Sequence, residues 1–243
     1  MAQATSDTAP LTVVLVHGAF ADSSSWNGVI ERLQSNGIPV TAIANPLRGI
    51  SADSAYVASV LAQIPGPVLA VAHSYGGAVI SNAATGASNV VGLVYVAAFA
   101  PDEGEKLLEV EGASKDSVLT SALVPHQYPT ASGTGTEFSI DPAKARDAFA
   151  GDLSEAQAAL VGTIQRPVAD LAFGEPSGAP AWKNLPSWAV VATGDKAAGT
   201  DVVRSMAERA GADITQVDGS HVIMISQPDV VTDVIMKAVK AVT

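Results

Sequence analysis

The feature that most constrains this fold is an apolar run that ends directly in a polar, glycine-rich turn. Residues 68–72 read VLAVA and continue into HSYGG, with Ser74 as its second residue. Such a run is typical of a strand buried on both faces. A sharp turn from strand into helix requires small residues around its central position, so that the two elements can approach each other. The sequence therefore predicts a strand, a tight turn at Ser74 and a helix.

Similar apolar runs alternate with amphipathic segments on both sides of this unit. Strands are predicted at 11–16, 38–44, 68–72 and 90–98, with helices at 24–33, 51–64 and 78–84. The alternation resumes with strands at 188–193 and 214–217 and helices at 201–210 and 228–242. This order of elements favours an α/β fold with a mostly parallel sheet and helices on both faces.

The segment from Pro101 to Pro186 departs from the alternation. It lacks clear strand patterns and contains short helical stretches, one of which starts with a capping-box pattern at Ser154. Residues 130–136 are dense in Gly, Ser and Thr, which predicts a surface loop. The predicted organisation is a disordered leader at 1–10, a core at 11–100 and 187–243, and a helical cap inserted at 101–186.

Composition restricts the possible partners and compartments. The 243 residues are 48% apolar and 15% charged, which suits one large core. The net charge of −11, without a basic patch, argues against a nucleic-acid partner, and no apolar run is long enough to span a membrane. Cysteine is absent, and the first ten residues lack the pattern of a secretory signal. We expect a cytoplasmic protein, or one secreted after loss of a signal peptide, that is a monomer or homodimer.

A serine at such a turn needs a base if it is to act as a nucleophile. The chain offers His17, His73, His126 and His221. The side chain of His73 should point away from that of Ser74, because neighbouring residues of a strand face opposite sides. We expect His17 to brace the loop after the first strand, and His126 to be exposed in the cap or to contact a substrate. His221 follows the last strand, at the sheet edge where Ser74 lies, and is the best candidate base.

A carboxylate should orient that imidazole, and two N–H groups should bind the oxyanion of a tetrahedral intermediate. Asp195 directly follows a predicted strand and is our candidate acid. Asp218 is the alternative, but it lies three residues before His221 and is expected to shape that turn. The predicted oxyanion donors are the backbone amides of Tyr75, next to the serine, and Ala19, in the loop after the first strand.

The candidate substrate pocket is formed by side chains near these groups. We assign to it Phe20, Tyr75, His126 and Val222. The apolar composition of the cap indicates a compact, mostly hydrophobic substrate. The four histidines are too dispersed for a zinc site, so neither a metal nor an organic cofactor is expected.

Several motifs together resemble one known family. The strings HGAF, SSSW, AHSYGG, VYVAAFAPDEGE, ATGD and GSH are similar to the α/β-hydrolase superfamily, and within it to small carboxylesterases near the plant methyl esterase and hydroxynitrile lyase branch. The resemblance spans almost the whole chain and implies the α/β-hydrolase fold. It also implies the chain order nucleophile, acid, base, with a triad of Ser74, Asp195 and His221 and oxyanion amides from Ala19 and Tyr75.

The chain departs from the patterns of this family at two places, and from the pattern of its lyases at two more. Ala72 replaces the first glycine of the G-x-S-x-G elbow, and residues 196–199 (KAAG) replace a loop that often carries Ile-Pro. The lyases of the branch add a Thr after the first-loop His and a Lys after the catalytic His, where this chain has Gly18 and Val222. The resemblance therefore favours an esterase over a lyase.

The resemblance and the residues together predict a serine hydrolase. Its expected substrates are small, mainly hydrophobic carboxylic esters or lactones, cleaved through an acyl-enzyme on Ser74. Two other functions stay open. One is a cofactor-free perhydrolase of the haloperoxidase type, which would use the same triad with peroxide. The other is a ligand receptor derived from a hydrolase.

Overall fold

A six-stranded parallel sheet forms the centre of the molecule. The computed structural model describes residues 9–243, so the predicted leader at 1–10 lies outside the described residues except for its last two. The strands lie in the order β2-β1-β3-β4-β8-β9, and each is parallel to its neighbours. The predicted parallel sheet is thus confirmed. The strand bounds are Thr12–Val16 (β1), Val40–Ile43 (β2), Val68–His73 (β3), Val90–Val96 (β4), Ser187–Ala192 (β8) and Asp213–Val217 (β9).

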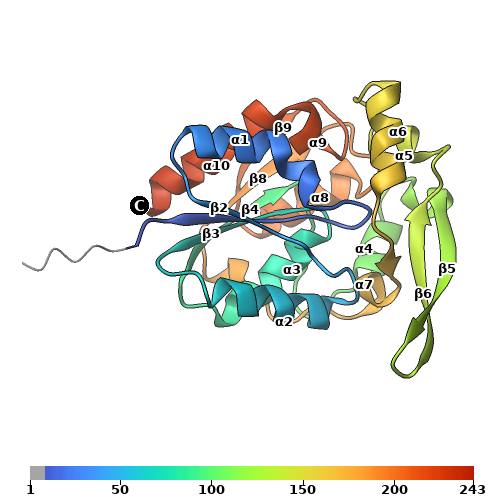
Figure 1. Ribbon diagram of the computed structural model, residues 1–243, viewed down its shortest axis with the longest axis horizontal. Helices are drawn as coiled ribbons and strands as arrows, with labels where there is room; N and C mark the ends of the chain where they lie inside the picture. The colour runs from blue at the N-terminus through green and yellow to red at the C-terminus, as the bar shows by residue number, and fades with distance from the viewer. Residues whose placement is uncertain (1–8) are drawn as a thin grey trace, which may run out of the picture.

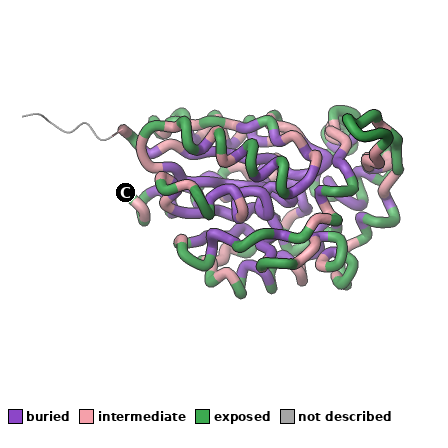
Figure 2. The backbone as a smooth tube through the Cα atoms, turned by 90° about the horizontal axis from the view of Figure 1, so that it is seen from below, coloured by how far each residue is buried: buried purple, intermediate pink, exposed green. Residues whose placement is uncertain are grey.

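Helices cover both faces of this sheet (Figure 1). On one face α1 packs against α10, and on the other α2 packs against α3. Every residue of β3 and β8 is buried, as expected for strands covered on both sides (Figure 2). The bounds are Ser23–Trp26 for a 3-10 turn, Asn27–Ser35 (α1), Ile50–Leu61 (α2), Gly76–Ala83 (α3), Thr200–Arg209 (α8), Ile223–Ser226 (α9) and Pro228–Val242 (α10).

Most of residues 101–186, which we call the cap segment, lie at the end of the sheet opposite the C terminus (Figure 1), and residues 179–186 return along α3 to the start of β8. The segment combines four short helices with a three-stranded antiparallel sheet. The predicted capping box is confirmed at the start of α6, where Gln157 N–H donates to Ser154 Oγ at 3.3 Å. The bounds are Leu107–Gly112 (α4), Leu123–Thr130 (β5), Gly133–Ile140 (β6), Ala145–Phe149 (α5), Glu155–Ile164 (α6), Val168–Ala169 (β7) and Leu171–Gly174 (α7).

The expectation of a purely helical cap is wrong, because β5 and β6 form a hairpin. Its turn occupies residues 131–132, so most of the predicted loop at 130–136 is strand. The sequence gives little sign of β5, because this strand lies at the edge of its sheet and most of its residues are exposed or half-buried. It also contains Pro125 and Pro129, and proline is typical of edge strands rather than central ones.

Two glycines let β3, the following turn and α3 pack tightly onto the neighbouring backbone. A Cβ atom on Gly76 would lie 2.8 Å from the carbonyl oxygen of Val16. A Cβ atom on Gly77 would lie 2.3 Å from the carbonyl oxygen of Phe99. Both separations are too short for a carbon and an oxygen in contact. The helix that begins after Ser74 can therefore approach the sheet this closely only with glycine at these positions.

We predict that Gly77→Ala destabilises the protein by roughly 1–3 kcal/mol or more, since the added methyl group overpacks a rigid backbone contact. The intrinsic preference of helices for alanine, about 1 kcal/mol, is too small to offset this clash. Gly86→Ala is the matched control, because a Cβ there would meet no atom within 4 Å. Urea unfolding of both variants checks the prediction. Equal stabilities would contradict the packing described here.

Candidate active site

Ser74 occupies the turn between β3 and α3 in a left-handed backbone conformation, with φ of 53°. This conformation is unfavourable for a residue with a side chain and persists only where surrounding contacts impose it. Here the Ser74 amide donates to the Val96 carbonyl at 3.3 Å, and the Ser74 carbonyl accepts from Phe99 N–H at 3.1 Å. The hydroxyl is thereby presented beside the N-terminus of α3, where backbone N–H groups favour negative charge.

His221 and Asp195 form a buried hydrogen-bonded pair. The distance from His221 Nδ1 to Asp195 Oδ2 is 2.8 Å, and each side chain is only 1% exposed. Because a carboxylate only accepts, Nδ1 carries the proton, and Nε2 of the neutral ring keeps a lone pair with which to accept another. The structure thus joins two residues that are far apart in the chain, in the pairing that the sequence predicts.

The unusual loop after Asp195 supports its carboxylate. Oδ1 of Asp195 accepts hydrogen bonds from the amides of Ala197 at 2.9 Å and Ala198 at 3.0 Å. The carboxylate therefore has partners on both oxygens, which a buried charge requires. The KAAG sequence at 196–199, a departure from the patterns of the family, still fixes the pose of the acid.

Asp218, the alternative acid, lies elsewhere. It is exposed, and its carboxylate accepts a hydrogen bond from Thr193 Oγ1 at 3.3 Å. Its carbonyl oxygen accepts from the side-chain amide of Gln227. These contacts shape the turn before His221, as the sequence analysis expects.

His73 links the Ser74 turn to the His221 loop. Its Nε2 donates to the His221 carbonyl at 3.0 Å, and the two ring centroids are 4.6 Å apart. Burial and the neighbouring His221 ring hold the pKa of His73 well below its ordinary value, so the ring is neutral. Within the described chain Ser74 Oγ has no hydrogen-bond partner. Hydrogen bonds to a nucleophile are often long in ligand-free sites.

The two predicted oxyanion donors belong to segments that adjoin Ser74. Among residues 9–243, neither the Ala19 amide nor the Tyr75 amide donates a hydrogen bond. The Ala19 loop packs directly on the serine, because a Cβ atom on Gly18 would lie 2.5 Å from Ser74 Cβ. Phe20 continues this loop with a positive φ of 59°. The Ala19 loop and the residue after Ser74 thus each offer an unused N–H group, as an oxyanion hole requires.

His17 braces this loop, as predicted. Its Nδ1 donates to the Gly18 carbonyl at 2.9 Å, and its Nε2 accepts from the Asn45 amide at 3.0 Å. The Asn45 side chain in turn donates to the His17 carbonyl at 3.1 Å. Burial lowers the pKa of His17 to about 4, so near pH 7 the ring is neutral and can act as donor and acceptor at once.

The Tyr75 side chain does not fit its predicted place in the substrate pocket. It is fully buried, and its hydroxyl donates to Asp53 Oδ2 at 2.7 Å. Asp53 is itself buried and also accepts from the Arg48 amide at 3.1 Å. Burial raises the pKa of Asp53, and it raises that of Tyr75 as well. The side chain of Tyr75 thus holds the turn in place through Asp53, while its amide donates no hydrogen bond to the described residues.

An apolar cleft of about 250 Å³ opens between α6 of the cap segment and the start of α1. Phe20 and Val222, two of the predicted pocket residues, line it. His126 does not line it, because it lies exposed on β5 with Nε2 2.8 Å from Ser139 Oγ. Its other apolar walls are Phe149, Leu153, Leu160, Val161, Ile164 and Ile225, and polar residues at its rim include Asp22, Ser24, Ser25, Asn27 and Gln157.

Phe149 is a site residue that sequence reasoning missed. Its ring centroid lies 5.1 Å from that of His221 and 6.2 Å from that of Phe20. It belongs to α5, a helix of five residues whose short apolar pattern gives no sign of a contact with His221. Only the folding of the cap segment onto the sheet edge brings this ring over the site.

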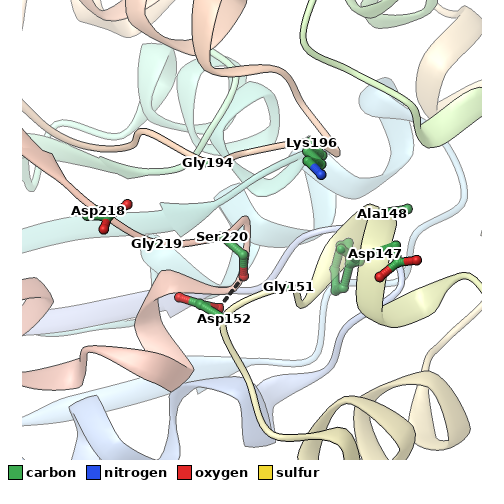
Figure 3. A pocket seen from close by; sticks show the side chains of 10 residues that line it. Asp147, Ala148, Gly151, Asp152, Gly194, Lys196, Asp218, Gly219 and Ser220 are labelled. Carbon is green, nitrogen blue, oxygen red and sulfur yellow. Dashed lines mark hydrogen bonds between the residues drawn. The ribbon is translucent and has the colours of Figure 1, made fainter.

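A second, more polar cleft of about 320 Å³ lies beside the His221 loop (Figure 3). Gly219 and Ser220, the two residues before His221, line it together with Asp152 and Lys196. Phe149 lines both clefts. The base is therefore flanked by a polar cleft at Ser220 and an apolar cleft at Val222.

The described residues show neither a membrane span nor a metal cluster. Among residues 9–243, no helix is long and apolar enough to cross a bilayer. No group of three or more His, Asp or Glu side chains in this part of the chain is placed to hold a metal ion.

Comparisons with known proteins agree with the fold. Residues 13–234 match the model of the Alpha/beta hydrolase family, and no curated protein matches the sequence. Polyneuridine aldehyde esterase has a similar structure, with a TM-score of 0.79, 22% identity and coverage of 95% of this chain and 99% of that one.

Two bacterial structures are similar as well. A pyrethroid hydrolase from Sphingobium faniae JZ-2 has a TM-score of 0.76 and 20% identity, covering 96% of this chain and 98% of that one. An extracellular α/β-hydrolase from a Paenibacillus species has a TM-score of 0.77 and 21% identity, covering 94% and 99%. That protein is described as sharing structural and functional homology with tobacco salicylic acid binding protein 2.

Proposed function

The chain belongs to the alpha/beta hydrolase family, and from the geometry of its site we propose that it is a serine hydrolase of small, mainly hydrophobic carboxylic esters. One observation carries the proposal. A buried imidazole, oriented by a carboxylate at 2.8 Å, lies at the sheet edge where Ser74 projects from a strained turn. Serine, imidazole and carboxylate in these positions are the parts of a nucleophilic triad.

In the proposed mechanism, Ser74 Oγ attacks the ester carbonyl carbon while His221 Nε2 accepts the hydroxyl proton. Asp195 stabilises the resulting imidazolium, and the amides of Ala19 and Tyr75 bind the oxyanion. The imidazolium then gives its proton to the leaving alcohol as the C–O bond breaks, and the acyl group stays on Ser74. A water molecule, deprotonated by His221, then attacks the acyl carbon. The bond from the acyl carbon to Ser74 Oγ breaks as the imidazolium returns its proton to Ser74, and the acid is released.

The apolar cleft supports a hydrophobic substrate. Phe20 and Val222 belong to its walls, and Val222 is the residue next to the base. An apolar arm of an ester placed there would gain about 25 cal/mol for each Å² of apolar surface removed from water. Two proteins of similar structure, polyneuridine aldehyde esterase and a pyrethroid hydrolase, are compatible with ester substrates.

The residues that distinguish the related lyases support hydrolysis instead. A threonine side chain at position 18 would overlap Ser74, because even a Cβ atom there lies 2.5 Å from Ser74 Cβ. Position 222 carries a fully buried valine. It therefore supplies no cation beside His221 to stabilise a leaving anion.

We predict that a fluorophosphonate probe labels Ser74 and that Ser74→Ala loses both labelling and esterase activity. The loss in kcat should be about 10⁴- to 10⁶-fold, because the members of a triad act as a unit. Ser59→Ala is the matched control, since Ser59 is an exposed residue of α2 that lines neither cleft. Peptide mapping by mass spectrometry locates the label, and p-nitrophenyl esters of increasing acyl length measure turnover. Labelling elsewhere, or peroxide-dependent halogenation without ester turnover, would count against the proposal.

Exchanging each candidate acid for its amide tests the assignment of Asp195. Asp195→Asn should lower kcat about 10⁴-fold, because the amide would favour the wrong tautomer of His221. Asp218→Asn should stay within a few-fold of wild type, since its carboxylate accepts only from Thr193 Oγ1, outside the triad. Steady-state kinetics on the best p-nitrophenyl ester gives both values. A larger loss in Asp218→Asn would show that Asp195 is not the acid.

A further inference from the structure

We propose that Asp152, in the cap segment, is a positioning residue that holds the His221 loop in place by binding Ser220. The inference rests on the proposed function, because it concerns the base of that mechanism. Its consequence is that the cap segment takes part in setting the position of the base as well as in covering the site.

The contact is direct. The Ser220 hydroxyl donates to Asp152 Oδ1, and Figure 3 shows the two side chains pointing toward one another. Ser220 immediately precedes His221, and it is 6% exposed. The carboxylate also lies against Gly219, where a Cβ atom would come within 2.9 Å of Asp152 Oδ2. Asp152 therefore touches both residues before the base.

The charge on Asp152 is stabilised by this contact. Burial alone would favour the neutral acid, but hydrogen bonds from Ser220 and Ser226 lower the pKa of Asp152 below its ordinary value. The group is therefore an anion near neutral pH. A hydrogen bond to an ionised acceptor is stronger than one between neutral groups, which suits a residue that must hold a loop.

The core holds the same loop through backbone contacts. Gly194 N–H donates to the Gly219 carbonyl at 2.9 Å, and His73 Nε2 donates to the His221 carbonyl at 3.0 Å. The hydrogen bond from Ser220 to Asp152 is of another kind, because it joins a side chain of the loop to the cap segment. Asp152 thus restrains the loop from the cap segment.

A second contact from the same stretch of the cap segment reaches the base. Phe149, three residues before Asp152, places its ring 5.1 Å from the His221 ring. A shift of residues 149–152 would move the aromatic ring and the Ser220 anchor together. Displacing a catalytic group by about 1 Å can cost as much as 10²-fold in rate. The position of residues 149–152 on the core is therefore expected to affect the rate at which His221 acts as a base.

The matched control is Asp147. It lines the same polar cleft (Figure 3) and is exposed, and its carboxylate accepts no hydrogen bond from the described residues. Asp147→Asn removes one negative charge from the cleft without touching the Ser220 anchor. Lys196 and Asp218, the other charged residues of the cleft, are left unchanged in every variant.

The experiment measures kcat and KM of the full chain on a p-nitrophenyl ester for Asp152→Ala, Asp152→Asn, Ser220→Ala and Asp147→Asn. We expect about 10- to 100-fold loss of kcat in Asp152→Ala and in Ser220→Ala, with KM within about 3-fold. Asp152→Asn should lose less, because its amide oxygen can still accept from Ser220. Asp147→Asn should stay within about 2-fold of wild type.

A double variant separates positioning from general destabilisation. If the Ser220 hydroxyl acts through Asp152, the double variant Asp152→Ala with Ser220→Ala should lose no more kcat than Asp152→Ala alone. Additive losses, or kcat within 2-fold of wild type in Asp152→Ala, would overturn the proposal. If Asp152→Ala does not fold, Asp152→Asn and Ser220→Ala decide, and wild-type kcat in both would overturn it.

If the proposed ester hydrolysis is wrong, the experiment gives a different result from the one expected if only the role of Asp152 is wrong. In that case the wild-type protein itself would show no ester turnover that depends on Ser74, whatever residue stands at position 152. With such turnover established in wild type, the Asp152 series tests the positioning role alone.

Discussion

The parallel alignment of β3, β8 and β9 is the constraint on which the rest of this structure depends. Each strand ends at the same edge of the sheet, so the segments that follow them meet although they are far apart in the chain. Ser74 follows β3, Asp195 follows β8 and His221 follows β9. The buried hydrogen bond between Asp195 and His221 exists only because this register brings the last two loops together.

Burying the polar groups of this site costs free energy of desolvation, and hydrogen bonds from the surrounding backbone offset that cost. An ionised carboxylate away from water must have partners, and Asp195 obtains them from the amides of Ala197 and Ala198 as well as from His221. Two neutral histidines also hold the loops of the site in place. His17 fixes the loop after β1, and His73 joins the Ser74 turn to the His221 loop. These contacts hold the loops that carry the Ala19 and Tyr75 amides, which are the proposed oxyanion donors.

The sequence predicts the sheet and the pairing of Asp195 with His221 well, because both follow from strong local signals. Continuous apolar runs mark the buried strands, and the polar residue after each run must lie at the edge. The β5–β6 hairpin leaves no such signal, since it is half-exposed and interrupted by Pro125 and Pro129. The Tyr75 hydroxyl and the Phe149 ring could not be placed, because their partners, Asp53 and His221, lie far away in the chain.

A crystal structure of the Ser74 phosphonate adduct would show whether Ser74, His221 and two amides act on one carbonyl group. A phosphonate oxygen imitates the oxyanion of the tetrahedral intermediate. We expect this oxygen about 2.7–3.1 Å from the amides of both Ala19 and Tyr75, with His221 Nε2 in hydrogen-bonding reach of the Ser74 ester oxygen. An adduct whose oxygen faces solvent, or whose serine is out of reach of His221, would contradict the account.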